Sequence, residues 1–198
     1  SVARPAQTDP RPAETDARPA HTAASPQAAG ASAATGARPL VLALPRGGVP
    51  VAAPVAAALG ADLDIVVVRK IGAPGQPELG VGAIAEDGPP VFHPGALRAL
   101  GLREADLAGT VAAERAELLR RIRRYRGNRP APSATDRLVV VVDDGLATGI
   151  TALAALRWLR TQRPRRLVVA APVCSGHVRA TLDGAADAIA CLHVPKRF

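Results

Sequence analysis

The chain has 198 residues, which suits one domain with a sizeable core, and its apolar side chains are almost all aliphatic, since one Trp, one Tyr and two Phe occur. No apolar run approaches the ~18 residues of a membrane-spanning helix, and the first residues lack the apolar stretch of a secretory signal peptide. With two cysteines outside any metal-site spacing and a net charge of +8, we expect a cytoplasmic protein with reduced core cysteines that binds phosphate-rich ligands or nucleic acid.

Residues 1–39 differ in composition from the rest of the chain. Ala, Pro, Thr and Ser dominate this segment, and large apolar side chains are almost absent from it. Such a segment cannot bury enough apolar surface to offset the entropy that is lost on ordering. We therefore expect residues 1–39 to be a disordered tail and residues 40–198 to form the folded domain.

The first predicted elements form a strand–helix–strand unit. Leu40–Leu44 is a short apolar run typical of a strand, and Val49–Leu59 is typical of a helix that ends at Gly60. Another apolar run, Asp64–Arg69, predicts a second strand that pairs in parallel with the first. The turn after the first strand lacks the GxGxxG motif, so a dinucleotide-binding fold is not indicated.

Cations and glycines lie at the ends of both strands. Arg46 precedes Gly47 and Gly48, which let the backbone approach an anion closely, and Arg69 and Lys70 end the second strand. Ligands of open α/β sheets bind at the carboxyl ends of the strands. The sequence therefore predicts an anion site here, although solvated surface cations would give the same pattern.

The segment from Ile71 to Pro94 is rich in Gly and Pro. Within it, Val81–Ala85 and Pro90–Phe92 are expected to pair as a hairpin around a turn at Glu86–Gly88. Glu78 is the one acidic residue in the loop that precedes this hairpin. It could approach a reacting group, but a solvated loop position explains it equally simply.

Two helices are expected next, a short one at Gly95–Gly101 and a long one at Arg103–Arg126. Apolar side chains recur along one face of the long helix, at Leu107, Val111, Leu118, Ile122 and Tyr125. Seven arginines and one glutamate lie between residues 115 and 129. They could contact nucleic acid, but they spread around much of the helix, so we favour a solvated face near an anion site.

The most informative stretch is LVVVVDDGLATGIT, residues 138–151. The apolar run Leu138–Val142 predicts a strand with both faces buried, as in a parallel sheet, and Asp143 and Asp144 follow it. A Gly145–Gly149 turn then leads into a helix. Backbone N–H groups of such a turn bind phosphate, and paired carboxylates bind vicinal hydroxyls or a hard cation such as Mg²⁺. The stretch therefore predicts a site for a phosphorylated sugar.

The remaining elements complete an α/β pattern. Strands are predicted at Arg166–Pro172 and Asp187–His193, and helices at Ile150–Gln162 and at Gly176–Leu182, the second capped by Ser175. Strands and helices that alternate in this order predict a doubly wound, mainly parallel sheet.

Residues Val139–Thr151 resemble the motif with which type I phosphoribosyltransferases bind 5-phosphoribosyl-1-pyrophosphate (PRPP): an apolar strand, two acids, a short loop and Thr-Gly-x-Thr. The resemblance covers Leu40 to about His193. It implies a type I phosphoribosyltransferase-like domain that acts in nucleotide metabolism with Mg²⁺ as its cofactor. It also implies that the loop before the hairpin is mobile and closes over the substrate.

The resemblance implies a role for each matching residue. Asp143 and Asp144 would bind the ribose hydroxyls and Mg²⁺, and the loop after them would bind the 5′-phosphate. Arg46 and Lys70 would act on the pyrophosphate, so the expected catalytic residues are these two and the two acids. The expected PRPP-binding residues are Gly47, Gly48, Arg69, Asp143, Asp144, Gly145, Leu146, Ala147, Thr148, Gly149 and Thr151.

Two departures from the family pattern concern the acceptor. Many enzymes that act on 6-oxopurines have a third acid immediately before the Thr-Gly, where this chain has Ala147, and a methyl group cannot relay a proton. Family members also commonly select the base with a hood of terminal segments, whereas this sequence stops five residues after its last predicted strand. Neither departure affects PRPP binding, but the acceptor cannot be read from the sequence.

Three functions are compatible with the sequence. We favour an enzyme that transfers the 5-phosphoribosyl group of PRPP to a nitrogen nucleophile and releases pyrophosphate. The alternatives are a PRPP-sensing regulator without turnover, which could act on nucleic acid through the arginine-rich helix, and a hydrolase of phosphorylated sugars, for which no water-activating base is evident. For the favoured enzyme we expect PRPP and an unidentified nucleophile as partners, no membrane and no nucleic acid, with a homodimer left open.

Overall fold

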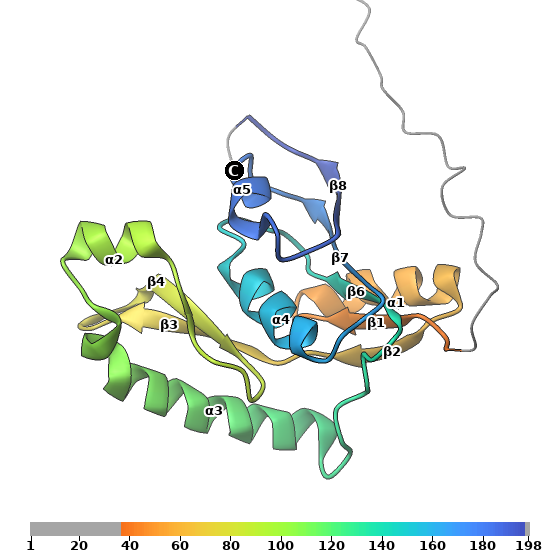
Figure 1. The fold of residues 1–198 in the computed structure, drawn as a ribbon, viewed down its shortest axis with the longest axis horizontal. Coiled ribbons are helices and arrows are strands. Elements are labelled where there is room, and N and C mark those ends of the chain that lie inside the picture. Colours follow the sequence, from red (N-terminus) through yellow and green to blue (C-terminus); the bar gives the residue numbers. More distant parts are fainter. Residues whose placement is uncertain (1–36, 197–198) are drawn as a thin grey trace, which may run out of the picture. The chain divides into compact units, whose positions relative to one another are not determined.

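The structure is a computed structural model, and it describes residues 37–196. The tail expected at residues 1–39 therefore lies almost entirely outside the described residues. Figure 1 shows the elements, which in chain order are β1 (Leu40–Ala43), α1 (Gly48–Leu59), β2 (Asp62–Ile65), β3 (Val68–Ala73), β4 (Gln76–Ala85), β5 (Val91–Phe92), α2 (Pro94–Leu100), the short 3₁₀ helix η2 (Glu104–Leu107), α3 (Ala108–Arg126), β6 (Leu138–Val142), α4 (Ile150–Thr161), β7 (Arg166–Val173), α5 (Val178–Leu182) and β8 (Ala188–His193).

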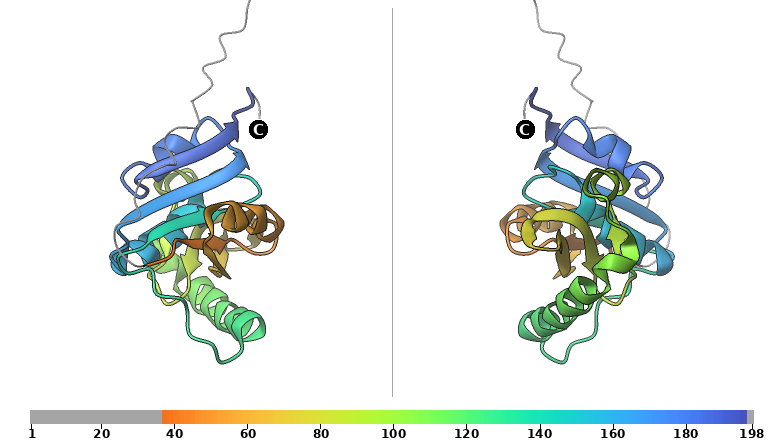
Figure 2. Two further views of the ribbon diagram at one scale, coloured as in Figure 1. Left: turned by 90° about the vertical axis from the view of Figure 1, so that its right-hand side faces the viewer. Right: turned by 90° about the vertical axis from the view of Figure 1, so that its left-hand side faces the viewer.

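Five strands form a parallel sheet in the order β2-β1-β6-β7-β8. Each strand is parallel to its neighbours, and the register places Leu40 of β1 opposite Asp62 on one side and Val139 on the other. Figure 2 shows the strands stacked from the orange β1 to the blue β8. The predicted doubly wound, mainly parallel sheet is confirmed.

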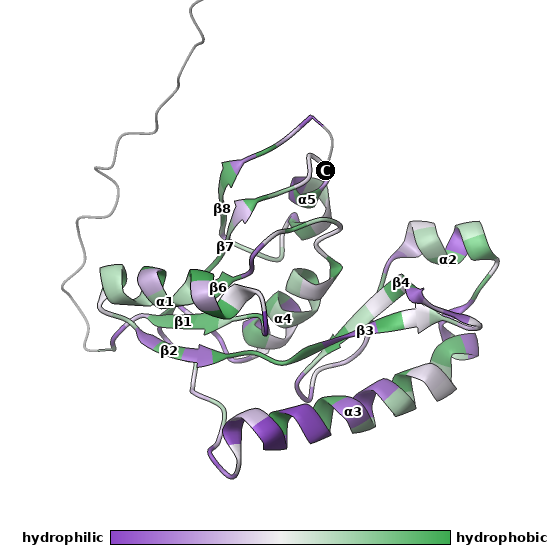
Figure 3. Cartoon of the chain, turned by 180° about the vertical axis from the view of Figure 1, so that it is seen from behind, coloured by the Kyte–Doolittle hydropathy of each residue, from purple (hydrophilic) through white to green (hydrophobic). Residues whose placement is uncertain are grey.

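Different helices cover the two faces of this sheet, because successive side chains of a strand point to opposite faces. Leu40 and Leu42 of β1 join the core cluster that α4 and α5 cover, whereas Val41 packs with Ala52 and Ala56 of α1. A strand that is buried on both faces needs apolar residues at every position. Figure 3 accordingly shows β1 and β6 in the green of hydrophobic residues.

A second sheet, antiparallel and in the order β3-β4-β5, packs against α3. Leu118 of α3 is fully buried among Ile71 and Ile84 of this sheet, and Ile122 and Tyr125 are partly buried beside it. The predicted apolar face of the long helix is therefore confirmed. So is the predicted hairpin around residues 86–88, whose strands are β4 and β5.

One expected strand, Asp64–Arg69, is divided between the two sheets. Val66 and Val67 connect β2 to β3, and both side chains are buried. The Val66 N–H donates to the carbonyl of Ala43 (3.0 Å) and the Val67 N–H to Glu86 Oε1 (2.8 Å). The prediction was wrong because the apolar run continues across the change of sheet, so periodicity gives no sign of it.

The Gly- and Pro-rich segment that precedes the predicted hairpin is also paired. The register of β3 and β4 runs from Val68 opposite Ala85 to Ala73 opposite Gln76, with irregularities at Gly72. This segment was expected to be a loop. Cross-strand pairing extends almost to the turn after Ala73, so the structure has a long hairpin arm in its place.

A buried arginine joins the end of α3 to both sheets. Arg126 donates from Nη1 and Nη2 to the carboxylate of Glu86 (2.9 and 2.8 Å) and from Nη2 to the carbonyl of Ile65 (2.6 Å). Its Nε lies 3.6 Å from Asp64 Oδ1. Arg126 and Glu86 are each only 5% exposed. Since a buried charge is costly without a partner, this pair fixes the end of α3 in position.

The two cysteines form a disulfide, so the expectation of reduced cysteines was wrong. Cys174 follows β7 and Cys191 lies in β8, and their Cα atoms are 6.2 Å apart. The sequence does not show that these positions meet, because they become neighbours only when β8 pairs with β7.

Candidate functional site

The site lies where the turns after β1 and β6 meet. These strands are central neighbours, but the chain continues from β1 to β2 on one side of the sheet and from β6 to β7 on the other. Doubly wound folds bind ligands at such a switch point, beyond the carboxyl ends of the strands. A hydrogen bond from the Leu44 N–H to the carbonyl of Val142 (2.9 Å) holds the two turns together.

Two glycines permit the close approach of the turns. A Cβ atom on Gly48 would lie 2.5 Å from the backbone oxygen of Val142, and one on Gly47 would overlap the carboxylate of Asp144. Gly47 has helical backbone angles, with φ of −61°. Glycine is therefore needed at these positions because a side chain would not fit, and not because of unusual dihedral angles. Without side chains at Gly47 and Gly48, the backbone of this turn lies directly against the acids.

A cavity of about 530 Å³ opens at this point. Its size falls within the range of roughly 300–1,000 Å³ that is usual for small-molecule sites. The two turns form its floor. The remaining wall comes from Val68, Arg69 and Lys70 of β3, Pro77 and Glu78 of β4, and Glu114 of α3.

The two acids of the floor differ in their surroundings. Asp143 is half-buried, and this burial raises its pKa to about 7. The Asp144 carboxyl group acts in the same direction, whereas the hydrogen bond from the Asp144 N–H and the charge of Lys70 oppose the shift. The Asp144 N–H donates to Asp143 Oδ1 (2.9 Å). A carboxyl group in this position takes up a proton or a cation readily, because either one relieves its desolvation.

The turn after the acids is braced by the end of β7. The Leu146 N–H donates to the carbonyl of Val173 (2.9 Å), the Ser175 N–H donates to the carbonyl of Leu146 (2.8 Å), and the Ser175 hydroxyl donates to the carbonyl of Ala147. The prediction that Ser175 caps a helix was wrong, since α5 begins later, at Val178. Its hydroxyl instead fixes this turn.

The braced turn leads into α4, and the turn and the start of this helix line one end of the cavity. Gly149 precedes the helix with φ of 76°, a conformation that glycine adopts without strain. The first N–H groups of a helix have no partner within it, so this end of the cavity presents donors and a partial positive charge. Such an end suits a phosphate group.

The structure brings together most of the residues expected from the sequence. Every expected PRPP-binding residue lines the cavity except Gly48, which is buried at the start of α1, and Lys70 lines it too. Arg46 does not, because its side chain lines a different and smaller cavity against α3.

Glu114 was missed from the sequence. It lies on α3, and its carboxylate accepts a hydrogen bond from Arg69 Nε (2.7 Å) at the cavity wall. The chain gives no local signal for it, since Glu114 is one charged residue on a mostly polar helix face. Only the packing of α3 beside β3 brings it to the site.

None of the residues that line the cavity has an aromatic ring. The cavity therefore offers no ring on which a planar base could stack. On the side formed by β3, β4 and α3, it presents carboxylates, cations and the small apolar groups of Val68 and Pro77.

The metal expected at the acids agrees with their chemistry. Within residues 37–196, no group of three or more His, Cys, Asp and Glu side chains could hold a metal ion by itself. Mg²⁺ does not require one, since it is usually held by one or two carboxylates together with substrate phosphates and water. Asp143 and Asp144 fit this pattern. In the same range, no helix is long and apolar enough to cross a membrane.

The family model described as "Phosphoribosyl transferase domain" matches residues 24–191 of the chain. The "Putative phosphoribosyl transferase Rv0571c" of Mycobacterium tuberculosis H37Rv is 44% identical over 159 residues, which are 80% of this chain and 36% of that protein. The same identity and coverage hold for its counterpart in strain CDC 1551. The chain thus spans about a third of the length of the curated relatives it matches.

Among solved structures, TT1426 from Thermus thermophilus is 45% identical, with a TM-score of 0.66, over 82% of this chain and 76% of that one. The AQ2163 protein from Aquifex aeolicus is 12% identical, with a TM-score of 0.50, over 80% of this chain and 56% of that one. The second likeness concerns the fold alone.

Proposed function

Since the chain belongs to the phosphoribosyl transferase domain family, we propose that it transfers the 5-phosphoribosyl group of PRPP to a nitrogen nucleophile and releases pyrophosphate. One observation carries the proposal. The acids after β6 lie between the glycine turn after β1, which they contact, and the turn that leads into the N-terminus of α4, and all three line one cavity. A ligand with a diol between two phosphate groups matches this order of donors and acceptors.

The acids and the α4 turn would hold the phosphoribosyl part of PRPP. Asp143 and Asp144 accept hydrogen bonds from the two ribose hydroxyls, and Mg²⁺, when bound there, neutralises charge on the pyrophosphate. The 5′-phosphate occupies the turn from Gly145 to Thr151, where backbone N–H groups and the hydroxyls of Thr148 and Thr151 donate to it.

The glycine turn and β3 would hold the pyrophosphate. The backbone at Gly47 approaches it, and Lys70 and Arg69 supply positive charge from the opposite wall. We assign no contact to the Arg46 side chain, because it lines the other cavity. In the reaction, the C1′–O bond breaks and its electron pair leaves with the pyrophosphate. The acceptor nitrogen forms the new bond to C1′ and afterwards loses a proton.

A second candidate, a protein that binds PRPP without turnover, is supported by two observations. Ala147 offers no group that could accept the proton of the acceptor, and no ring in the cavity wall could stack on a base. The alternatives differ in whether pyrophosphate is released when an acceptor is supplied.

The test is an assay for pyrophosphate release from PRPP and Mg²⁺ with a panel of acceptors: purines, pyrimidines, ammonia and small amines. We expect release that depends on one acceptor class and falls at least about a thousandfold in Asp143→Asn/Asp144→Asn, because removal of a group that acts on transition-state charge typically costs 10²–10³. The exposed Asp183→Asn is the matched control. Binding of PRPP without release would favour the second candidate, and a chain that does neither would contradict both.

A further inference from the structure

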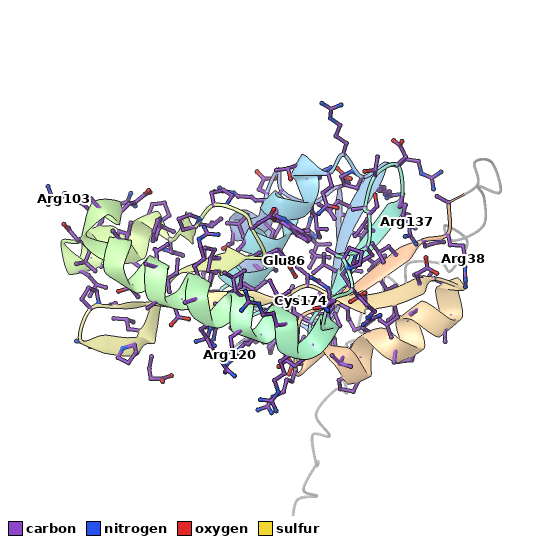
Figure 4. All side chains as sticks on the ribbon, turned by 90° about the horizontal axis from the view of Figure 1, so that it is seen from below. Arg38, Glu86, Arg103, Arg120, Arg137 and Cys174 are labelled. Atoms are coloured by element: carbon purple, nitrogen blue, oxygen red, sulfur yellow. A yellow bond between two sulfur atoms is a disulfide. The ribbon has the colours of Figure 1, made fainter. Side chains whose placement is uncertain are left out.

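A second cavity, of about 210 Å³, lies on the α3 side of the turn after β1. Arg46 lines it together with Arg120, Arg121, Arg124 and Tyr125. On α3, Arg120 and Arg124 are four positions apart, as are Arg121 and Tyr125, so the members of each pair are neighbours on the helix surface and the two pairs lie side by side. Figure 4 labels Arg120 on α3, well along the helix from Arg103, which lies near its start.

Positive charge at this cavity is only partly neutralised. Arg120 and Arg121 share a single carboxylate, that of Glu117, with N–O distances of 2.6 to 2.8 Å. These hydrogen bonds lower the pKa of Glu117 to about 2. Within residues 37–196, Arg46 and Arg124 form no ion pair, so four guanidinium groups face one carboxylate. Like charges held this close repel one another unless an anion lies between them.

The arginines of the long helix, which were expected to form a solvated face near an anion site, do not all lie alike. Arg120, Arg121 and Arg124 converge on one cavity with an arginine from a distant turn, whereas Arg123 points elsewhere and does not line it. Figure 3 shows this end of α3 in the purple of hydrophilic residues. No local sequence pattern shows that these arginines meet, because Arg46 lies about sixty residues before the start of α3 in the chain.

We infer that this cavity binds the diphosphate group of a small phosphorylated ligand. Guanidinium groups are planar donors that match pairs of phosphate oxygens, and the Tyr125 hydroxyl adds a further donor. The volume of about 210 Å³ is below the roughly 300–1,000 Å³ of sites that enclose a whole drug-sized ligand. A diphosphate fits such a space, and any organic group attached to it would extend into solvent. The inference does not depend on the reaction proposed for the larger cavity.

The test is a titration with inorganic pyrophosphate in EDTA, followed through the side-chain Nε–Hε signals of the arginines by ¹⁵N NMR. EDTA removes the divalent cations that would assist pyrophosphate binding in the larger cavity, and the Nε–Hε signal of Arg69, which lines that cavity, reports any pyrophosphate that binds there instead. We expect saturable shifts for Arg46, Arg120, Arg121 and Arg124, and no shift for Arg123. Orthophosphate should bind more weakly because it offers fewer oxygens. A nucleoside diphosphate that produces the same shifts would show that the site also accepts an attached organic group.

Two variants that each remove one positive charge distinguish specific binding in this cavity from nonspecific attraction of pyrophosphate to the positively charged surface. Arg124→Gln should weaken pyrophosphate binding about tenfold, the effect of losing one charge-assisted interaction of about 1.4 kcal/mol. Arg123→Gln should change it less than about twofold. Both side chains are exposed, and circular dichroism should confirm that both variants fold.

Three results would overturn the inference: no saturable shift in the parent chain, equal weakening by the two variants, or duplex DNA binding far tighter than about 10⁻⁶ M at physiological salt that both variants weaken alike. The last result would assign the arginines to a nucleic-acid surface, since binding weaker than that is the non-specific range.

Discussion

The two sides of the larger cavity are built in different ways. The floor, from the turns after β1 and β6, consists mainly of backbone groups, two glycines and two adjacent acids, all within short segments of the chain. The wall, from β3, β4 and α3, consists of side chains that meet only through packing, such as Arg69 and Glu114. The floor is therefore fixed by local geometry, and the wall depends on how the second sheet and α3 are held.

This difference has a functional consequence. Under the proposed function, residues of the floor would face the ribose hydroxyls and the phosphates, which every reaction of PRPP shares. Arg69 and Lys70 of the wall would face the pyrophosphate as well, but the other wall residues can differ without affecting these groups, and they are where an acceptor would be selected. The predictions below change one side of the cavity at a time.

The largest effect on stability is expected at the buried ion pair that holds the wall. Arg126→Ala leaves Glu86 buried without its partner, so it should lower the free energy of unfolding by about 3–5 kcal/mol. Arg103→Ala removes an exposed pair with Asp106 before the other end of α3 and should cost about 0–1 kcal/mol. Urea denaturation of the two variants measures both values. Equal costs would show that Arg126 does not hold α3 in the way described.

A smaller effect is expected at the glycines of the floor. Gly48→Ala places a methyl group 2.5 Å from the backbone oxygen of Val142, which cannot move away, and should cost about 1–3 kcal/mol. Gly47→Ala meets the Asp144 side chain instead. That side chain can rotate, so this variant should lose PRPP affinity with less loss of stability. Gly80→Ala, where a Cβ has open space, is the control. The account fails here if Gly48→Ala unfolds at the same urea concentration as the control.

The smallest effect concerns the protonation of Asp143. Its pKa is raised to about 7 in the folded chain, against about 3.9 for an unfolded Asp. Between these values the folded state holds a proton that the unfolded state has lost. The contribution of Asp143 to the free energy of unfolding therefore falls as the pH rises from about 4 to about 7. Asp143→Asn removes this dependence.

The melting temperature of Asp143→Asn relative to the parent should therefore rise from pH 5 to pH 8 by a few degrees, since 1 kcal/mol corresponds to roughly 2–4 °C in a chain of this size. Scanning calorimetry at both pH values measures it. A difference that does not change with pH would mean that Asp143 ionises like an exposed carboxyl group.

The sequence predicted the residues of the floor more completely than those of the wall, where it indicated Arg69 and Lys70 but not Glu114, and the reason is physical. In the floor, Asp143, Asp144 and the turn that follows are consecutive, so a local pattern records both their identity and their spacing. The strands β1 and β6 are buried on both faces, and their continuous apolar runs predict this.

The contacts that form the wall join segments that are far apart in the chain, so they leave no such local pattern in the sequence. The change of sheet at Val66 and Val67 falls inside an apolar run, and Glu114 reaches the site only because α3 packs beside β3. Arg46 belongs to the turn that forms the floor, yet its side chain lies with the arginines of α3. A local pattern gives the position of a side chain on its own element and not the element against which it packs.

The central claim is that the two acids after β6 bind PRPP together with Mg²⁺, and isothermal titration calorimetry tests it most directly. The parent chain should bind PRPP in the presence of Mg²⁺, and Asp143→Asn/Asp144→Asn should bind it at least about a hundredfold more weakly, the loss of two charge-assisted interactions. The double variant should remain folded, because neither acid supports the core. If it is folded and binds PRPP as tightly as the parent, the acids are not the binding site and the account is wrong.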